Sequence, residues 1–170
     1  VNPREKNVYG QIVRWREAGG DAAATTFEWD IFVLAGNPTV HTDRKDLRSG
    51  SANITADNTF NSPDGLAFDR DGRLWIQTDG KYSNKGDYAG QGNNQMLCAD
   101  PVTKEIRRFL VGPKECEVTG ITFTPDHKTM FINIQHPGEE GDSHWPDGGT
   151  SIPRSATVVI TKDDGGVIGS

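Results

Sequence analysis

The stretch that decides the fold occurs twice in this chain. Gly65-Leu-Ala-Phe-Asp-Arg-Asp-Gly-Arg-Leu-Trp-Ile76 can be laid over Gly120-Ile-Thr-Phe-Thr-Pro-Asp-His-Lys-Thr-Met-Phe-Ile132 with one inserted residue. Each copy reads glycine, apolar residue, small residue and phenylalanine, then a polar turn, a basic residue and an apolar run with an aromatic side chain. Because the first turn contains Asp71 and Gly72, a tight-turn pair, each copy is predicted to be a β-hairpin.

The spacing of the two copies predicts a repeat architecture. Repeats of antiparallel strands that are about 40 to 50 residues long are typical of β-propeller blades. These copies lie roughly 55 residues apart, because a loop rich in Gly and Asn, residues 79–94, lengthens the unit. A closed propeller needs about four or more blades. We therefore expect an all-β fold with antiparallel sheets, a partial β-propeller of about two blades plus edge strands, whose partner blades lie upstream.

Short apolar runs bounded by turn residues predict the individual strands. The predicted strands are Tyr9–Trp15, Thr26–Leu34, Leu66–Phe68, Leu74–Thr78, Gln95–Ala99, Glu105–Leu110, Gly120–Thr124, Thr129–Ile134 and Thr157–Thr161. One short helical turn is predicted at Thr42–Arg48.

The composition narrows the class of function. The 170 residues include 24 acidic and 18 basic side chains, a formal charge of -6. This balance argues against a nucleic-acid binder, which needs a basic surface, and suits a protein that holds cations. No apolar run reaches the roughly 18 residues needed for a membrane span. The two cysteines, Cys98 and Cys116, allow one bridge at most, and the sequence leaves their pairing open.

Carboxylates precede the first strand of each repeated hairpin. In a propeller this position lies at the mouth of the central channel, so Asp64 and Glu117 are expected to converge on one axis, and Asn61 could add an amide oxygen. Such oxygens suit hard cations like Ca²⁺. The equivalence is imperfect, because Asp64 aligns with Thr119. The alternative is that Asp64 merely bonds its own backbone in a turn.

Other polar residues have weaker patterns. Asp79 ends a strand, where a structural Asx-turn is the default interpretation. His136 and Glu139 follow another strand and could serve as metal ligands or as a general acid and base, although a lone loop histidine is more often simply exposed. Cys116 is expected to be a buried structural residue. The sequence contains no Gly-x-Ser-x-Gly elbow, Walker motif or His-Glu-x-x-His motif.

Several segments together resemble the C-terminal portion of PhoX-type alkaline phosphatases, from Asn2 to about Ile160. The resemblance is strongest in Cys116-Glu-Val-Thr-Gly120 and Asn133-Ile-Gln-His-Pro-Gly-Glu139. Further matching segments are Tyr9-Gly-Gln-Ile12, Thr26-Phe-Glu-Trp-Asp30, Ser62-Pro-Asp-Gly-Leu66, Leu74-Trp-Ile-Gln-Thr-Asp79 and Gly92-Asn-Asn-Gln-Met-Leu97.

The resemblance implies a β-propeller phosphatase that carries iron and calcium and hydrolyses phosphate esters at alkaline pH. It implies export through the twin-arginine route to the periplasm or cell surface. Residues 1–170 would be the C-terminal blades, inactive alone, whose main partners are the phosphate-ester substrate and the missing N-terminal blades. The family's acidic pocket matches Glu117 most firmly, then Asp64 and Asn61. Its iron-binding cysteine would lie upstream and is not Cys116.

Two alternatives remain open from the sequence. The segment Pro63-Asp-Gly-Leu-Ala-Phe-Asp69, followed by Gly72-Arg-Leu-Trp75, is also similar to gluconolactonase-type propellers, in which the matching aspartate binds one divalent metal for lactone hydrolysis. The third possibility is a non-catalytic β-propeller module that only binds a partner. The three hypotheses differ in the metal content that they predict for the complete protein.

Overall fold

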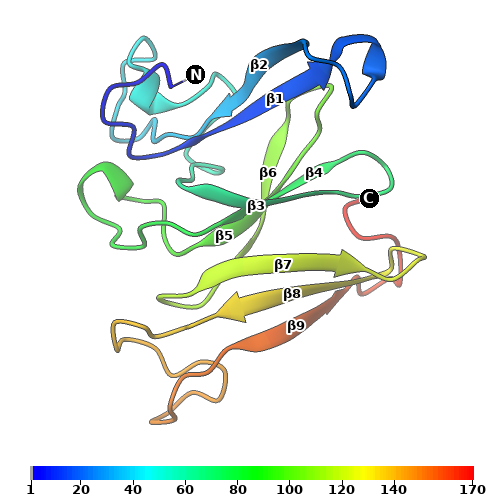
Figure 1. Cartoon of the computed structure of the whole chain (residues 1–170). Coiled ribbons are helices and arrows are strands. Elements are labelled where there is room, and N and C mark those ends of the chain that lie inside the picture. The colour runs from blue at the N-terminus through cyan, green and yellow to red at the C-terminus, as the bar shows by residue number, and fades with distance from the viewer. Residues whose placement is uncertain (1) are drawn as a thin grey trace.

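The fold was obtained as a computed structural model that describes residues 2–170. It is built from antiparallel strands, and its helical segments in the described residues are three short 3-10 turns, η1 (Ala18–Gly20), η2 (Leu47–Ser49) and η3 (Gly86–Tyr88) (Figure 1). The strands are β1 (Gln11–Glu17), β2 (Phe27–Leu34), β3 (Pro63–Phe68), β4 (Leu74–Thr78), β5 (Gln95–Ala99), β6 (Ile106–Val111), β7 (Glu117–Phe123), β8 (Thr129–Gln135) and β9 (Ala156–Thr161).

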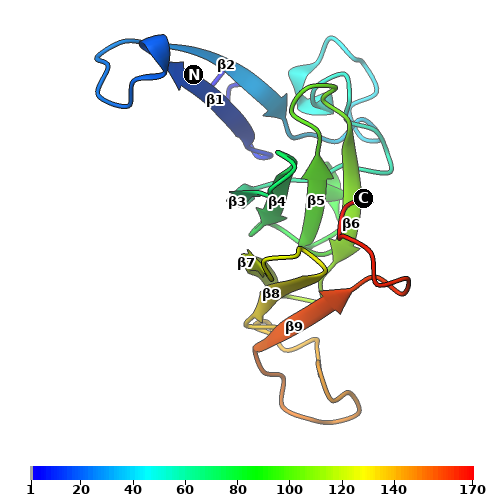
Figure 2. The ribbon, with the colours of Figure 1, turned by 90° about the vertical axis from the view of Figure 1, so that its right-hand side faces the viewer.

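The strands form three sheets that follow one another along the chain. The β1–β2 hairpin comes first, the meander β3-β4-β5-β6 lies in the middle, and β7-β8-β9 comes last (Figures 1 and 2). Every pairing is antiparallel. The all-β prediction is therefore confirmed. No barrel or propeller closes within residues 2–170, so the propeller arrangement stays a prediction.

The two central strands of the middle sheet, β4 and β5, are buried on both faces, which explains their continuous apolar runs. Alternate side chains of a strand point to opposite faces. Leu74 and Ile76 accordingly pack with the β1–β2 hairpin in one core, and Trp75 packs with β7 and β8 in a second core. Trp75 is fully buried, lies edge-on to Phe109 at 4.9 Å between ring centroids, and donates its indole N–H to a carboxylate oxygen of Asp69 at 3.0 Å.

The repeated sequence forms equivalent hairpins, β3–β4 and β7–β8, as predicted. The register of each hairpin shifts at the glycine that opens the repeat. A side chain on Gly120 would place its Cβ 2.5 Å from the amide nitrogen of Asn133, and Gly120 also has a φ of 55°. Glycine is therefore favoured at this irregularity, because a larger residue would strain the backbone and displace the side chain of Asn133.

The predicted strand positions agree closely with the structure, whereas the predicted helical turn was misplaced. Residues Thr42–Arg48 were expected to be helical, but a single 3-10 turn begins only at Leu47. The side chain of Asp46 accepts a hydrogen bond from the backbone of Arg48 and caps this turn. Earlier in the segment, Asp43 makes the same kind of local bond to Lys45, which favours turns over a helix.

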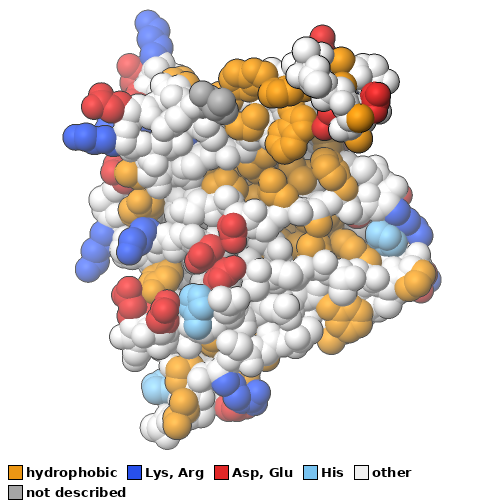
Figure 3. Space-filling model, in the orientation of Figure 1, with side chains coloured by type: hydrophobic (Ala, Val, Ile, Leu, Met, Phe, Trp, Pro, Cys, Tyr) orange, Lys and Arg blue, Asp and Glu red, His pale blue; other side chains and the backbone are white. Residues whose placement is uncertain are grey.

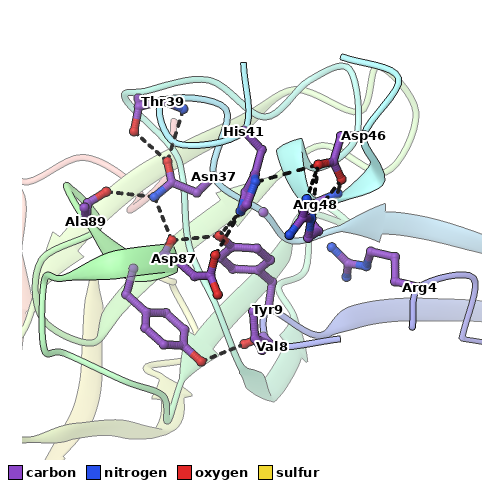
Figure 4. Close-up of polar contacts among 12 residues, drawn as sticks. Arg4, Val8, Tyr9, Asn37, Thr39, His41, Asp46, Arg48, Asp87 and Ala89 are labelled. Carbon is purple, nitrogen blue, oxygen red and sulfur yellow. Dashed lines mark hydrogen bonds and ion pairs between the residues drawn. The ribbon is translucent and has the colours of Figure 1, made fainter. Parts of the chain in front are cut away.

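A polar junction fastens the 37–50 loop to the start of the chain and to η3 (Figure 4). His41 Nε2 lies 2.9 Å from the hydroxyl oxygen of Tyr9 and 3.1 Å from a carboxylate oxygen of Asp87. The Tyr9 hydroxyl donates to the backbone oxygen of Asp87, so its oxygen accepts from His41 and the imidazole proton belongs on Nε2. Nδ1 faces Asp46 at 3.7 Å. Three segments are thereby held together by one largely buried imidazole.

One face of the molecule leaves large apolar side chains uncovered. They gather over the β1–β2 hairpin and the adjacent β3 (Figure 3). The most exposed are Trp15 at 61%, Phe27 at 60%, Trp29 at 51%, Leu66 at 49% and Phe68 at 68%. A groove of about 360 Å³ lies among them. An uncovered apolar face of this kind marks an interaction surface.

Two smaller questions from the sequence are also answered. Cys98 and Cys116 are both free, and Cys116 is buried as expected. Burial raises the pKa of the Cys116 thiol to about 12, so it is an inert thiol at neutral pH. Among residues 2–170, no helix has the length and apolar character needed to cross a membrane.

Candidate metal site

Two hairpins bring their acidic ends to one place. Glu117 is the first residue of β7, whereas Asp79 and His136 directly follow the last residues of β4 and β8. Antiparallel pairing puts the start of β7 beside the end of β8, and β4 of the middle sheet packs against β7, so the three positions share one end of the sheets. One ligand atom from each of Asp79, Glu117 and His136 lies within 4.8 Å of the others. We call these three residues the acidic cluster.

Glu117 is the central member of the acidic cluster. Its carboxylate is largely buried, and Oε2 lies 3.7 Å from Nε2 of His136. Burial raises the pKa of Glu117, and the negative charges of Asp79 and Asp64 raise it further. Asp64, on β3, therefore lies near enough for its charge to act on Glu117, but it is not one of the three cluster members. Figure 3 shows acidic side chains gathered beside a histidine on this face.

His136 is held in an unusual backbone conformation that aims its ring at Glu117. Its φ is 37°, in the left-handed region that non-glycine residues seldom adopt. Its backbone N–H donates to the hydroxyl of Ser155 at 2.9 Å. Nδ1 lies 3.4 Å from a carboxylate oxygen of Glu139, yet this buried nitrogen makes no hydrogen bond. Local strain at such a position is consistent with a functional role.

Asn61 forms hydrogen bonds with the loop that follows Asp79. Its Oδ1 accepts hydrogen bonds from the Ser62 hydroxyl at 3.0 Å and from the backbone N–H of Lys81 at 3.1 Å. Its Nδ2 donates to Gln91 at 2.8 Å. A Cβ at Gly80 would lie 2.0 Å from Asn61 Oδ1, so only glycine allows this close approach. Asn61 therefore lies against Gly80, the residue after Asp79, with its oxygen already in use, and the convergence of Asp64 with Glu117 stays a prediction.

The donor set of the acidic cluster fits a cation. In the described part of the chain, no lysine or arginine forms an ion pair with Asp64, Asp79 or Glu117. Several carboxylates that crowd together without a cationic partner repel one another, and a bound metal ion relieves that repulsion. Carboxylate oxygens suit Ca²⁺, and imidazole with carboxylate suits iron.

Sequence reasoning underrated two of the three cluster members. Asp79 was interpreted first as a turn residue and His136 as an exposed loop residue. The signal was present in the repeat, since each is the first residue after the second strand of an equivalent hairpin. That common position, next to the first-strand carboxylates, would have predicted their convergence.

The charge on Glu117 gives a pH-dependent prediction for the metal-free chain. A raised carboxyl pKa contributes stability at acidic pH that is lost as the pH rises from the ordinary glutamate range through the raised pKa. With a chelator present, Glu117→Gln should therefore melt at a higher temperature than the native chain at about pH 8, with a smaller difference near pH 4. Thermal unfolding followed by circular dichroism measures both. A lower melting temperature for the variant at about pH 8 would contradict the assigned electrostatics.

Comparison with known proteins gives the family context. Residues 1–138 match the family described as alkaline phosphatase PhoX. A solved structure, "Pseudomonas fluorescens PhoX in complex with vanadate, a transition state analogue", is 63% identical, covers 99% of this chain and superposes with a TM-score of 0.95. The chain spans 29% of the length of that protein's chain. A search of curated proteins found no match.

Proposed function

The chain belongs to the alkaline phosphatase PhoX family, and from this premise we propose that it is one part of a metal-dependent alkaline phosphatase that hydrolyses phosphate esters. The observation that carries the proposal is the acidic cluster, Asp79, Glu117 and His136, with the charge of Asp64 acting on Glu117. The three cluster residues converge on one end of two sheets, and within residues 2–170 no lysine or arginine forms an ion pair with Asp79 or Glu117. In a member of this family, such a cluster is best explained as a cation site.

We propose that Glu117, Asp79 and Asp64 hold the cations, with His136 as a further ligand. Calcium and iron are the ions that the family resemblance and the donor chemistry favour. When bound, such cations supply positive charge that neutralises the phosphoryl oxygens and acidifies bound water. Asn61 then acts indirectly, through its hydrogen bond to the loop that follows Asp79.

The chain's own residues hold the carboxylates in place before a cation binds. Burial fixes the carboxylate of Glu117 at the start of β7, and its crowding with Asp79 and Asp64 is an electrostatic cost that exists before any ion arrives. A cation converts that repulsion into attraction, so binding is favoured without rearrangement of the sheets. We infer that these carboxylates bind cations and do not attack the substrate, because a bound cation withdraws electron density from a carboxylate and makes it a weaker nucleophile.

The uncovered apolar face supports the proposal that the chain is one part of a larger protein. Trp15, Trp29 and Phe68 are exposed on the β1–β2 hairpin and β3, and the PhoX structure to which the chain is similar is more than three times as long. We propose that preceding blades of a β-propeller cover this face in the complete protein. Export to the periplasm or cell surface by the twin-arginine route is part of the same proposal.

Metal analysis of the complete protein tests the proposed function. A PhoX-type phosphatase should contain iron and calcium and should turn over a chromogenic phosphate ester. A lactonase of the gluconolactonase type should contain one divalent ion and hydrolyse lactones, and a binding module should contain no metal. A purified complete protein that holds no metal under any loading condition would refute the phosphatase assignment.

A further inference from the structure

We infer that Asn94 is a positioning residue that sets the separation of two metal-ligating segments, and this inference rests on the proposed function of the acidic cluster. Asn94 lies directly before β5, in the loop rich in Gly and Asn, and it is 4% exposed. It belongs to neither hairpin that carries Asp79 and Glu117. Its side chain nevertheless forms hydrogen bonds to the residue after Asp79 and to the residue before Glu117.

The side chain of Asn94 forms hydrogen bonds to both sequence neighbours of Asp79. Its Oδ1 accepts from the hydroxyl of Thr78 at 2.9 Å and from the backbone N–H of Gly80 at 2.8 Å. Its Nδ2 donates to the backbone oxygen of Gly80 at 3.1 Å. The residues on either side of Asp79 are therefore tied to the same amide group, which fixes the backbone from which the Asp79 carboxylate extends.

The remaining bond of Asn94 reaches the other ligand segment. Nδ2 also donates to the backbone oxygen of Cys116, the residue directly before Glu117, at 2.8 Å in a fully buried contact. An asparagine side chain can accept two hydrogen bonds and donate two, and here all four are made. A fully satisfied buried network has one arrangement, so it is rigid.

This arrangement determines how far apart the two carboxylates sit. Asp79 and Glu117 repel each other, so without a tie between their backbones the loop after β4 would relax away from β7. Asn94 opposes that relaxation with neutral hydrogen bonds that do not compete for the cation. Outer partners that orient metal ligands in this way typically account for about 10- to 100-fold in metal affinity.

Asn94→Ala and Asn58→Ala form a matched pair for the test. Asn58 is also buried, at 7% exposure, and its Nδ2 donates to the backbone oxygens of Asn53 and Ile106, while its Oδ1 accepts from Thr55. Both substitutions remove a buried amide with a comparable set of bonds. Both are expected to lower the melting temperature, but only the first lies between ligand segments.

The experiment measures calcium retained by the complete protein after dialysis against buffers of graded free Ca²⁺. Subtracting the calcium retained by Glu117→Gln isolates the ions that depend on the acidic cluster. We expect Asn94→Ala to bind these ions about 10-fold or more weakly, while Asn58→Ala binds them like the native protein. Equal affinities for Asn94→Ala and Asn58→Ala would overturn the inference.

A milder variant covers the case in which Asn94→Ala fails to fold. Thr78→Val removes the hydroxyl that donates to Asn94 and accepts from the backbone N–H of Gln95, and it preserves the shape of the side chain. It should weaken Ca²⁺ binding in the same direction by a smaller factor, and unchanged affinity would again overturn the inference. If the native protein retains no cluster calcium at all, the proposed function fails instead, so the two failures are distinguishable.

Discussion

Replacing Glu117 with glutamine in the complete enzyme should reduce turnover of p-nitrophenyl phosphate by at least about 100-fold, beyond the roughly 10- to 100-fold effect of losing an outer partner of a metal ligand. Glutamine keeps the size of the side chain and removes its charge. Because Glu117 is buried and faces both Asp79 and His136, no other side chain can take over its place. Steady-state kinetics measures the loss of turnover, and elemental analysis of the same preparation measures the loss of bound metal.

Glu105→Gln is the matched control for this substitution. Glu105 is exposed and pairs with Arg107 at the outer strand β6, away from the acidic cluster. Exposed pairs contribute little, so activity and metal content should stay at the native level. Native activity in Glu117→Gln, with its metal content also unchanged, would show that this carboxylate is not a ligand.

The isolated 170-residue chain should show no phosphatase turnover above background, even with iron and calcium added. The acidic cluster offers only three adjacent ligand groups, with Asp64 nearby, which leaves a multinuclear site incomplete. The open edges of the β1–β2 hairpin and of β9 can also recruit other strands. We therefore expect the isolated chain to associate at high concentration.

Two measurements check this second prediction. Turnover of a chromogenic phosphate ester is compared at equal molarity for the isolated chain and the complete protein, and light scattering reports the mass of the isolated chain. Robust turnover by the 170 residues would disprove the idea that the rest of the polypeptide completes the site. A strictly monomeric chain at high concentration would show that its edges are protected.

The strands were predictable because their signals are local. The limits of β4 and β5 were predicted to the residue, since each is a short run that is buried on both faces and bounded by polar turns. The predicted start of β7 at Gly120 was three residues late, because Glu117 interrupts the apolar pattern there. A strand that begins with a buried carboxylate does not have the composition of a strand, and this departure marks the functional end of the sheet.

The candidate site was only partly predictable. Glu117 and Asp64 were expected to converge from their place in the repeat. The charge of Asp64 does raise the pKa of Glu117, but Asp64 is not one of the three cluster members, so their convergence on one site stays a prediction. The inclusion of His136 depends on the antiparallel pairing of β8 with β7, whereas that of Asp79 depends on the packing of β4 against β7 across two sheets. The role of Asn94 depends on a loop that folds back between two hairpins, and no local pattern encodes that contact.

The sequence by itself determined the all-β class, the repeated hairpins and the acidic character of the strand starts, because backbone propensity and alternating burial act over a few neighbouring residues. The tertiary structure decided which acidic side chains lie together, how His136 is aimed and which face stays uncovered. These properties depend on distances between segments that are remote in the chain, and such distances are set by the packing of one sheet on the next.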